Sequence, residues 1–357
     1  MKKLFAISFL ILVIAAVGML AYYYFINIKF YKTGNISSNE DINLELPSQE
    51  GVEQNFWKVE ENINLYNFSE GEGRPVLVIH GGPGIPPERP WQGLSDLTSD
   101  FKFYYYHQRG CGDSTRPIQN FESKNYYQNM KDLDAKLGMG QQIADIERIR
   151  KILNQDKLII IGHSYGGFMA TLYALEFPQN VEKLVLVNPA GVLKLPPTDQ
   201  DMNMFSVIGN NLPAKDKETF KDWQKRYFDY GRLFEQDEKS LQQLNYEFIT
   251  FYEKYLVEQD TSLADHDRPK RENIGGWMVQ AMYLSVGRSY DYRQKLLDIE
   301  MPTLIIQGGQ DFSTKAAYEY ESYLGNTKLE FMEAAGHFVY NEFPEEFGDR
   351  VGNFIGK

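Results

Sequence analysis

Cysteine is nearly absent from this 357-residue chain, in which Cys111 is the single cysteine. One thiol can form neither an intramolecular disulfide nor a cysteine-ligated metal site. Histidine is also scarce: there are five, and no two stand in an HxxxH or HxH spacing. Zinc ligands on one element commonly have such spacings. The sequence therefore gives no support for a zinc site or a cysteine-ligated metal site.

The chain also lacks basic runs longer than a pair such as Lys2-Lys3. It has 37 Lys and Arg against 49 Asp and Glu, a formal net charge of −12. An acidic chain repels phosphate backbones, so we do not expect nucleic acid as a partner. A composition that is 43% hydrophobic and 24% charged is that of a globular protein and excludes a disordered one.

The N-terminus carries an uncharged apolar run from Leu4 to Ile28. This run exceeds the ~20 residues that cross a bilayer. A cleaved signal peptide is the alternative, with a small-residue site at 16–18, but the apolar run continues past it. We therefore predict a single-pass membrane anchor over residues 1–32, a polar tether over 33–51, and an extracytoplasmic catalytic domain. The charges that flank the run are nearly balanced, so its orientation is less securely predicted than its presence.

The remaining chain alternates between strand and helix patterns. Continuous apolar runs are typical of strands buried on both faces of a parallel sheet. Amphipathic or small-residue helical segments separate several of these runs. The alternation predicts right-handed crossovers and a mostly parallel sheet. The expected strands are 56–60, 63–68, 75–80, 101–106, 158–161, 184–187, 303–306 and 329–332, and the expected helices are 141–153, 168–177 and 344–355.

One long stretch interrupts this alternation. Residues 192–298 contain no buried parallel strand, but they do contain aromatic amphipathic segments such as 220–228 and 241–257. We interpret the stretch as a helical cap inserted into an α/β core made of 52–191 and 299–357.

The sequence Gly162-His163-Ser164-Tyr165-Gly166 follows an apolar strand and opens a helical run. GxSxG in this context predicts a sharp turn that presents the serine hydroxyl at a helix N-terminus. The helix dipole there favours developing negative charge. Ser164 is therefore the candidate nucleophile.

A serine nucleophile needs a base that is oriented by an acid. Asp311 follows the strand 303–306 through a Gly-Gly turn, and His337 follows the strand 329–332. Either residue alone could be a turn residue or a helix cap. Together they follow Ser164 in the order Ser, Asp, His and lie at strand ends, where α/β sheets place their sites. We predict Ser164, Asp311 and His337 as a catalytic triad.

The sequence His80-Gly81-Gly82-Pro83-Gly84 follows the first buried strand. Glycines there allow backbone N–H groups to approach a substrate oxyanion closely. We assign one oxyanion donor to the Gly82 N–H, with Gly81 as the alternative, and the other to the Tyr165 N–H. His80 is expected to brace the loop. An ordinary tight turn is the other interpretation.

Five motifs together resemble the proline iminopeptidase family of α/β-hydrolases: HGGPG at 80–84, HQRGCGDS at 107–114, GHSYGG at 162–167, GGQD at 308–311 and AGH at 335–337. The resemblance covers about residues 52–356. It implies the α/β-hydrolase fold and release of an N-terminal residue, typically proline, from short peptides. It also implies an acyl-enzyme on Ser164, with His337 as base and then acid and Asp311 holding it, and no metal or cofactor.

The chain departs from the family at two positions. His107 stands where the family usually has Asp, and Tyr165 stands where it often has Trp. Both changes bear on the substrate pocket, and His107 is therefore a candidate substrate contact. Gly81 of the HGGPG motif is a second candidate. Family members hold the substrate's α-ammonium with acidic side chains, mainly from the cap, and Glu247 is our candidate for this role. A carboxylesterase or other small-molecule hydrolase with the same triad is the alternative function.

Overall fold

The structure, a computed structural model, describes residues 29–34, 36, 42–199, 203–258 and 268–356. Its centre is an eight-stranded sheet in the order β1-β2-β4-β3-β5-β6-β9-β10. The β1–β2 and β2–β4 pairs are antiparallel and the other pairs are parallel. The predicted hairpin and mostly parallel sheet are therefore confirmed. The strands are β1 Phe56–Glu60, β2 Ile63–Gly71, β3 Arg74–Ile79, β4 Phe101–Tyr106, β5 Leu158–His163, β6 Val181–Val187, β9 Thr303–Gly308 and β10 Thr327–Met332.

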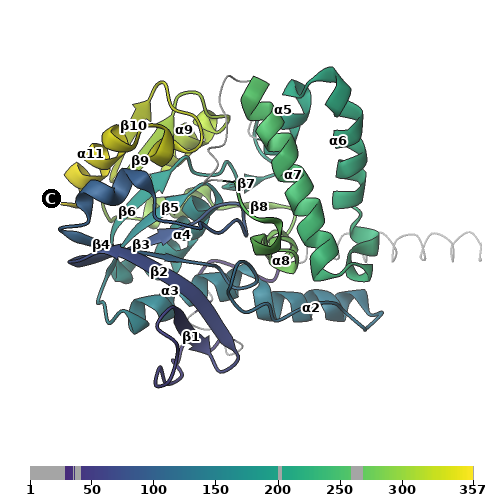
Figure 1. The fold of residues 1–357 in the computed structure, drawn as a ribbon, viewed down its shortest axis with the longest axis horizontal. Coiled ribbons are helices and arrows are strands. Elements are labelled where there is room, and N and C mark those ends of the chain that lie inside the picture. Colours follow the sequence, from purple (N-terminus) through teal and green to yellow (C-terminus); the bar gives the residue numbers. More distant parts are fainter. Residues whose placement is uncertain (1–28, 35, 37–41, 200–202, 259–267, 357) are drawn as a thin grey trace, which may run out of the picture.

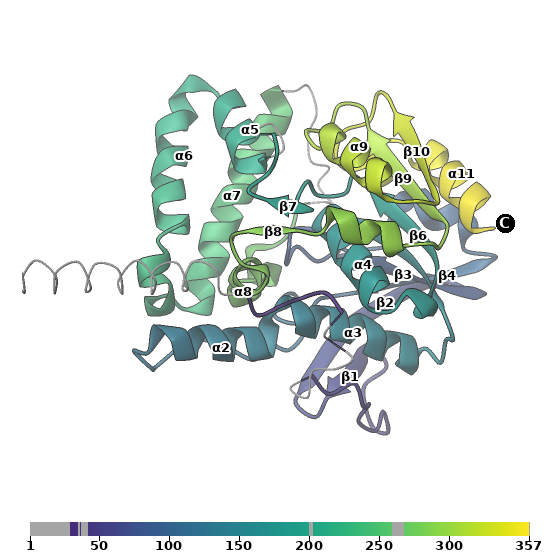
Figure 2. The same cartoon turned by 180° about the vertical axis from the view of Figure 1, so that it is seen from behind.

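Helices cover both faces of the sheet (Figures 1 and 2). Alternate residues of one strand point to opposite faces, so each parallel strand supplies two cores. Ile160 belongs to the core on one face of the sheet. Ile159 and Ile161 belong to the core on the other face, together with Phe347. These continuous apolar strands therefore bury both of their faces. The helices flanking the sheet are α2 Tyr126–Leu137, α3 Met139–Ile152, α4 Tyr165–Glu176, α9 Thr314–Tyr323, α10 Val339–Glu342 and α11 Pro344–Ile355.

The stretch between β6 and β9 forms a helical cap. Its helices are α5 Met204–Asn211, α6 Ala214–Tyr227, α7 Glu238–Glu258 and α8 Trp277–Val286. Figure 1 shows α5, α6 and α7 side by side, at the opposite end of the molecule from the C-terminus. A short antiparallel pair, β7 Lys194–Leu195 with β8 Tyr290–Asp291, joins the two ends of the cap. The aromatic side chains of the cap pack on one another, as where Trp223 stacks on Phe248 with ring centroids 5.3 Å apart.

The predicted membrane anchor is corrected. None of the helices formed by the described residues is long and apolar enough to cross a membrane. The longest of them, α7, alternates charged and apolar side chains and packs within the cap. The apolar segment 4–28, on which the prediction rested, lies outside the described residues. The structure therefore does not support a transmembrane helix, and it does not support the extracytoplasmic location inferred from one.

Parts of the predicted polar tether are docked on the core. The Glu176 carboxylate, at the end of α4, accepts hydrogen bonds from the Tyr31 hydroxyl (2.8 Å) and from the amides of Gly34 (2.6 Å) and Ile36 (3.2 Å). Further along, the Arg148 guanidinium on α3 donates from Nε to the carbonyl of Asn43 (3.1 Å). These contacts satisfy backbone groups that would otherwise need water.

Candidate active site

Ser164 lies in a strained turn between β5 and α4. Its φ of 53° and ψ of −122° place it in the left-handed half of backbone space, which non-glycine residues rarely occupy. Glycines make this turn possible. A Cβ on Gly166 would lie 2.3 Å from the carbonyl oxygen of Ile79, and one on Gly162 would lie 2.6 Å from that of Gly166. The turn thus packs against β3 at distances that only glycine allows.

Asp311 and His337 are hydrogen-bonded to each other. The Asp311 Oδ2 and His337 Nδ1 atoms are 3.0 Å apart, and both side chains are at least nine-tenths buried. Gln307 Nε2 (3.3 Å) and the Ser313 hydroxyl also donate to this carboxylate oxygen. Burial alone would raise the pKa of Asp311, but the nearby His337 and these hydrogen bonds outweigh burial and lower it. Asp311 is therefore an anion that can orient the imidazole.

Ser164 and His337 line the same cavity, between the β-strand ends and the cap. Gly81 and Gly82 line it from the loop after β3. The cap and the loop after β9 contribute apolar side chains, and the α10 region closes another side. The other lining side chains with aromatic rings are Trp91, Phe248, Tyr252, Phe312, Phe338 and Tyr340. The cavity thus brings together parts of the chain that are far apart in the sequence: the loop after β3, the turn at Ser164, the cap, the loop after β9 and the α10 region.

The loop after β3 approaches the serine closely. A Cβ on Gly81 would lie 2.8 Å from the Cβ of Ser164, so this approach also requires glycine. Gly82 has a φ of +114°. The Tyr165 N–H belongs to the first turn of α4, where amides lack an intrahelical acceptor. Gly81, Gly82 and Tyr165 therefore surround the nucleophile with backbone groups that a substrate oxygen could use.

His80 braces this loop through both ring nitrogens. Its Nε2 accepts from the Gln108 amide (3.2 Å), so its Nδ1 carries the proton and donates to the Gly81 carbonyl (2.9 Å). The Gln108 side chain donates in turn to the carbonyl of His80 (2.9 Å). Burial lowers the pKa of His80 to about 3, so the imidazole is neutral at neutral pH.

His107 holds the rim of the cavity. Its Nδ1 accepts from the Asp113 amide (3.0 Å), and its Nε2 donates to the carbonyl of Pro87 (3.2 Å). Pro87 lines the cavity, and His107 is absent from the described residues that do so. The structure thus places this candidate substrate contact one layer behind the cavity wall.

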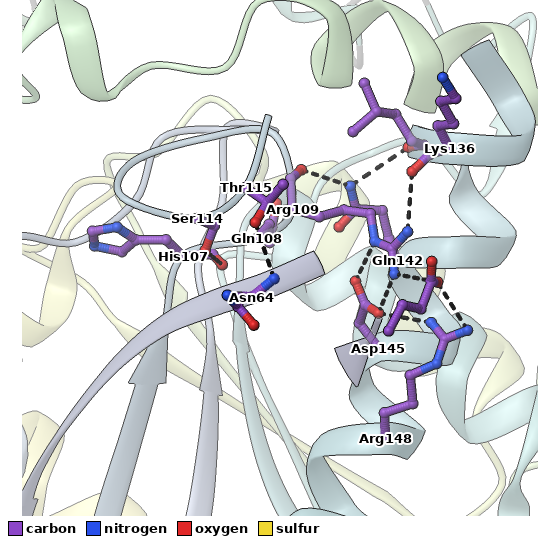
Figure 3. Close-up of polar contacts among 12 residues, drawn as sticks. Asn64, His107, Gln108, Arg109, Ser114, Thr115, Lys136, Gln142, Asp145 and Arg148 are labelled. Atoms are coloured by element: carbon purple, nitrogen blue, oxygen red, sulfur yellow. Dashed lines mark hydrogen bonds and ion pairs between the residues drawn. The ribbon is translucent and has the colours of Figure 1, made fainter. Parts of the chain in front are cut away.

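The Gln-Arg-Gly motif after β4 is clamped to α3 (Figure 3). Arg109 donates to both carboxylate oxygens of Asp145 at 2.6 Å and to Glu60 at 2.8 Å. Arg148 donates to Asp145 from the next turn of α3 at 2.8 Å. Arg109, Asp145 and Arg148 are all buried, so the motif acts here as a structural clamp behind the cavity.

Sequence reasoning did not anticipate two anchors of the loop that carries His337. The His163 Nε2 donates to the backbone carbonyl of His337 (2.9 Å), and the Asn188 Nδ2 donates to the same carbonyl (2.8 Å). Burial, with His337 acting in the same direction, lowers the pKa of His163 to about 3. Asn188 is a polar residue that directly follows the buried strand β6. Its place at a strand end was the signal in the sequence that could have marked it as part of the site.

The structure does not bring Glu247 to the cavity. Its carboxylate pairs with Arg226 of α6 (2.5 Å) on the outer side of the cap. Glu253, the other acidic residue of that segment, pairs with Arg268 (3.1 Å). Among the described lining residues, the carboxylate is Glu88, on the loop after β3.

The fold and this geometry define a hydrolase of the α/β-hydrolase type. The model of the α/β hydrolase fold family matches residues 74–344, so the chain belongs to this family. It is similar to the proline iminopeptidase of Heyndrickxia coagulans, with 27% identity over 82% of this chain and 94% of that one. The 1-acylglycerol-3-phosphate O-acyltransferase of Rattus norvegicus is 25% identical over 80% of this chain and 78% of that one.

A solved structure shows the same fold. The crystal structure of the proline iminopeptidase from Mycobacterium smegmatis superposes with a TM-score of 0.52. It is 16% identical and covers 83% of this chain and 96% of its own. The proline iminopeptidase relatives, at 23–27% identity, confirm the resemblance that the motifs predicted.

Proposed function

We propose that this hydrolase releases N-terminal residues, preferentially proline, from short peptides through an acyl-enzyme on Ser164. The observation that carries the proposal is the Asp311–His337 hydrogen bond beside a cavity that also holds Ser164 in its strained turn. The proline iminopeptidase relatives, which match along most of their length, support the choice of substrate.

In the proposed reaction, the Ser164 hydroxyl attacks the carbonyl carbon of the first residue. His337 takes the hydroxyl proton on Nε2, while Asp311 holds the opposite nitrogen and stabilises the imidazolium. The carbonyl oxygen becomes an anion, and the N–H groups of Gly82, or alternatively Gly81, and Tyr165 stabilise it.

The second half of the reaction regenerates the serine. His337 returns its proton to the leaving amine, and the C–N bond breaks to leave an ester on Ser164. Water then loses a proton to His337 and attacks this ester. His337 returns that proton to the Ser164 oxygen as the ester C–O bond breaks, and the free amino acid leaves. The imidazole thus acts as base and then acid in each half of the reaction.

The apolar lining suits a proline ring. Proline has no side-chain charge, and its rigid ring loses little conformational entropy on binding. Phe312 stacks near His337 with ring centroids 5.3 Å apart, and Tyr252 meets the same imidazole edge-on at 6.0 Å. These rings supply apolar surface beside the reacting groups.

The test is hydrolysis of proline anilide, alanine anilide, N-acetyl-proline anilide and a short acyl ester by the wild type and by Ser164→Ala. The proposal predicts cleavage of proline anilide that is lost both on N-acetylation and in Ser164→Ala. Ester cleavage without any anilide cleavage would move the function to an esterase with the same triad. Anilide cleavage that survives in Ser164→Ala would contradict the mechanism.

A further inference from the structure

The wall of the cavity carries two charged side chains in a largely apolar lining. Apart from histidines, Glu88 and Arg89 are the side chains in the described lining of the cavity that carry a charge at neutral pH. Glu88 is already paired: Lys270 lies 3.1 Å from one carboxylate oxygen, and Asn273 Nδ2 donates to the other at 3.0 Å. Both partners come from the cap, so Glu88 ties the loop after β3 to it.

Arg89 is exposed and unpaired. Within the described part of the chain it has neither a hydrogen bond nor an ion pair, although the chain as a whole has a net charge of −12. Most other arginines pair with carboxylates, as Arg109 does with Asp145 and Arg116 with Glu238. A free guanidinium on the wall of a catalytic cavity is therefore unusual in this molecule.

The backbone that carries Arg89 is stiff. Its segment, Pro86-Pro87-Glu88-Arg89-Pro90, contains three prolines, each of which fixes its own φ. Two further contacts hold the loop: the Gly275 N–H donates to the carbonyl of Gly84 (2.9 Å), and His107 donates to that of Pro87 (3.2 Å). The guanidinium is thus presented from a pre-organised loop, which reduces the entropy lost on binding.

We propose that Arg89 binds the C-terminal carboxylate of a short peptide whose first residue lies at Ser164. The proposal rests on the proposed function and specifies its substrate class. A guanidinium can hold a carboxylate through two parallel N–H···O hydrogen bonds, and an uncharged amide terminus cannot match this. Arg89 thereby selects short peptides with a free C-terminus.

The kinetic test compares Pro-Gly and Pro-Gly-Gly with their C-terminal amides. In the wild type, kcat/KM for the free acids exceeds that for the amides by roughly 3- to 10-fold for an ion pair at an exposed site. In Arg89→Gln this ratio falls to near one, mainly through KM, and Arg89→Lys retains part of it. Lys225→Gln, an exposed cation on α6, leaves the ratio unchanged. An Arg89→Gln ratio equal to the wild-type ratio would overturn the proposal.

A binding measurement separates this proposal from the proposed function. Calorimetry on Ser164→Ala, with or without Arg89→Gln, gives the affinity for Pro-Gly and for Pro-Gly-amide without turnover. Tighter binding of the acid that depends on Arg89 supports the carboxylate site, even if the wild type cleaves neither peptide and the proposed function fails. Equal affinity for the acid and the amide, or no binding of either, contradicts the carboxylate site at Arg89. Hydrolysis of proline anilide tests the proposed aminopeptidase activity independently of this result.

Discussion

Asn188 holds His337 by its backbone: the Asn188 Nδ2 lies 2.8 Å from the His337 carbonyl oxygen. The same side chain donates to the Gly336 carbonyl (3.0 Å) and accepts from the Gly308 amide (2.7 Å). Asn188 thus ties the end of β6 to the loops that carry both Asp311 and His337. The position of His337 relative to Ser164 therefore depends on this buried amide together with His163, which donates to the same carbonyl.

Asn188→Ala is expected to destabilise the protein by about 2–4 kcal/mol, because it leaves buried backbone groups without partners. Hydrolysis of proline anilide should also fall, through kcat, as His337 loses its anchor. Denaturant unfolding and steady-state kinetics measure the two effects. Asn188→Gly is the matched variant: its φ of 43° suits glycine, so any loss shared with Ala comes from the hydrogen bonds. Full activity in both variants would contradict the role given to Asn188.

Gly166→Ala is expected to disrupt the turn at Ser164. The added Cβ would lie 2.3 Å from a backbone oxygen of β3, which cannot move without opening the sheet. The expected result is a loss of at least about 2 kcal/mol of stability together with most of the activity. Gly325→Ala is the control, because nothing lies within 4 Å of its added Cβ. Thermal unfolding distinguishes the two, and similar melting temperatures would argue against the close approach of α4 and β3.

Stability is expected to fall as the pH decreases from about 6.5 toward 3. The pKa of both His80 and His163 is lowered to about 3 in the folded state, whereas an unfolded histidine titrates near 6.5. Between these values the unfolded chain binds protons that the folded chain does not, so unfolding becomes more favourable as the pH falls. Each histidine can contribute up to about 1.4 kcal/mol per pH unit in this window.

Asp311 extends the same trend to lower pH. Its pKa is lowered on folding, so its contribution to stability is present above the unfolded value and is lost as the pH falls through the folded one. Urea unfolding between pH 7.5 and 4.5 measures the slope from the histidines, and its extension to pH 3 measures the further loss from Asp311. His163→Gln should flatten the slope by about the share of one histidine. A slope identical to that of the wild type would show that His163 is not held neutral.

Asp145→Ala is expected to cost about 3–5 kcal/mol, because it removes the buried carboxylate that Arg109 and Arg148 share and leaves them only the partly exposed Glu60. The exposed pair of Asp222 and Lys225 provides the control, and Asp222→Ala should produce no measurable change. Chemical denaturation compares the two variants. A small effect of Asp145→Ala would mean that the clamp behind the cavity does not stabilise the fold.

Much of the fold could be predicted from local patterns. Strands such as β5 are continuous apolar runs, and α11 begins at a proline that suits the first turn of a helix. The helix α2 was not among the predicted elements, although its buried Met130, Leu133 and Leu137 recur at a helical spacing.

The arrangement of the candidate residues could be predicted where the chemistry needs a fixed order of motifs. Ser164, Asp311 and His337 follow three strands, and their order along the chain suggested that they lie close together in the fold. Glu247 was chosen for its aromatic neighbours in sequence, yet its ion pair with Arg226 depends on how α6 packs against α7. Contacts between elements that lie far apart in the sequence, such as that of Asn188 with His337, leave no local periodic signal.

The most direct test of the mechanism is to identify the residue that carries the acyl group. The wild type is mixed with a proline ester, quenched in acid within milliseconds to seconds, digested and examined by mass spectrometry. The account predicts a prolyl adduct on the peptide containing Ser164, which is absent in Ser164→Ala and strongly reduced in His337→Gln because the base that activates Ser164 is missing. An adduct on another residue, or turnover that persists in Ser164→Ala, would contradict it.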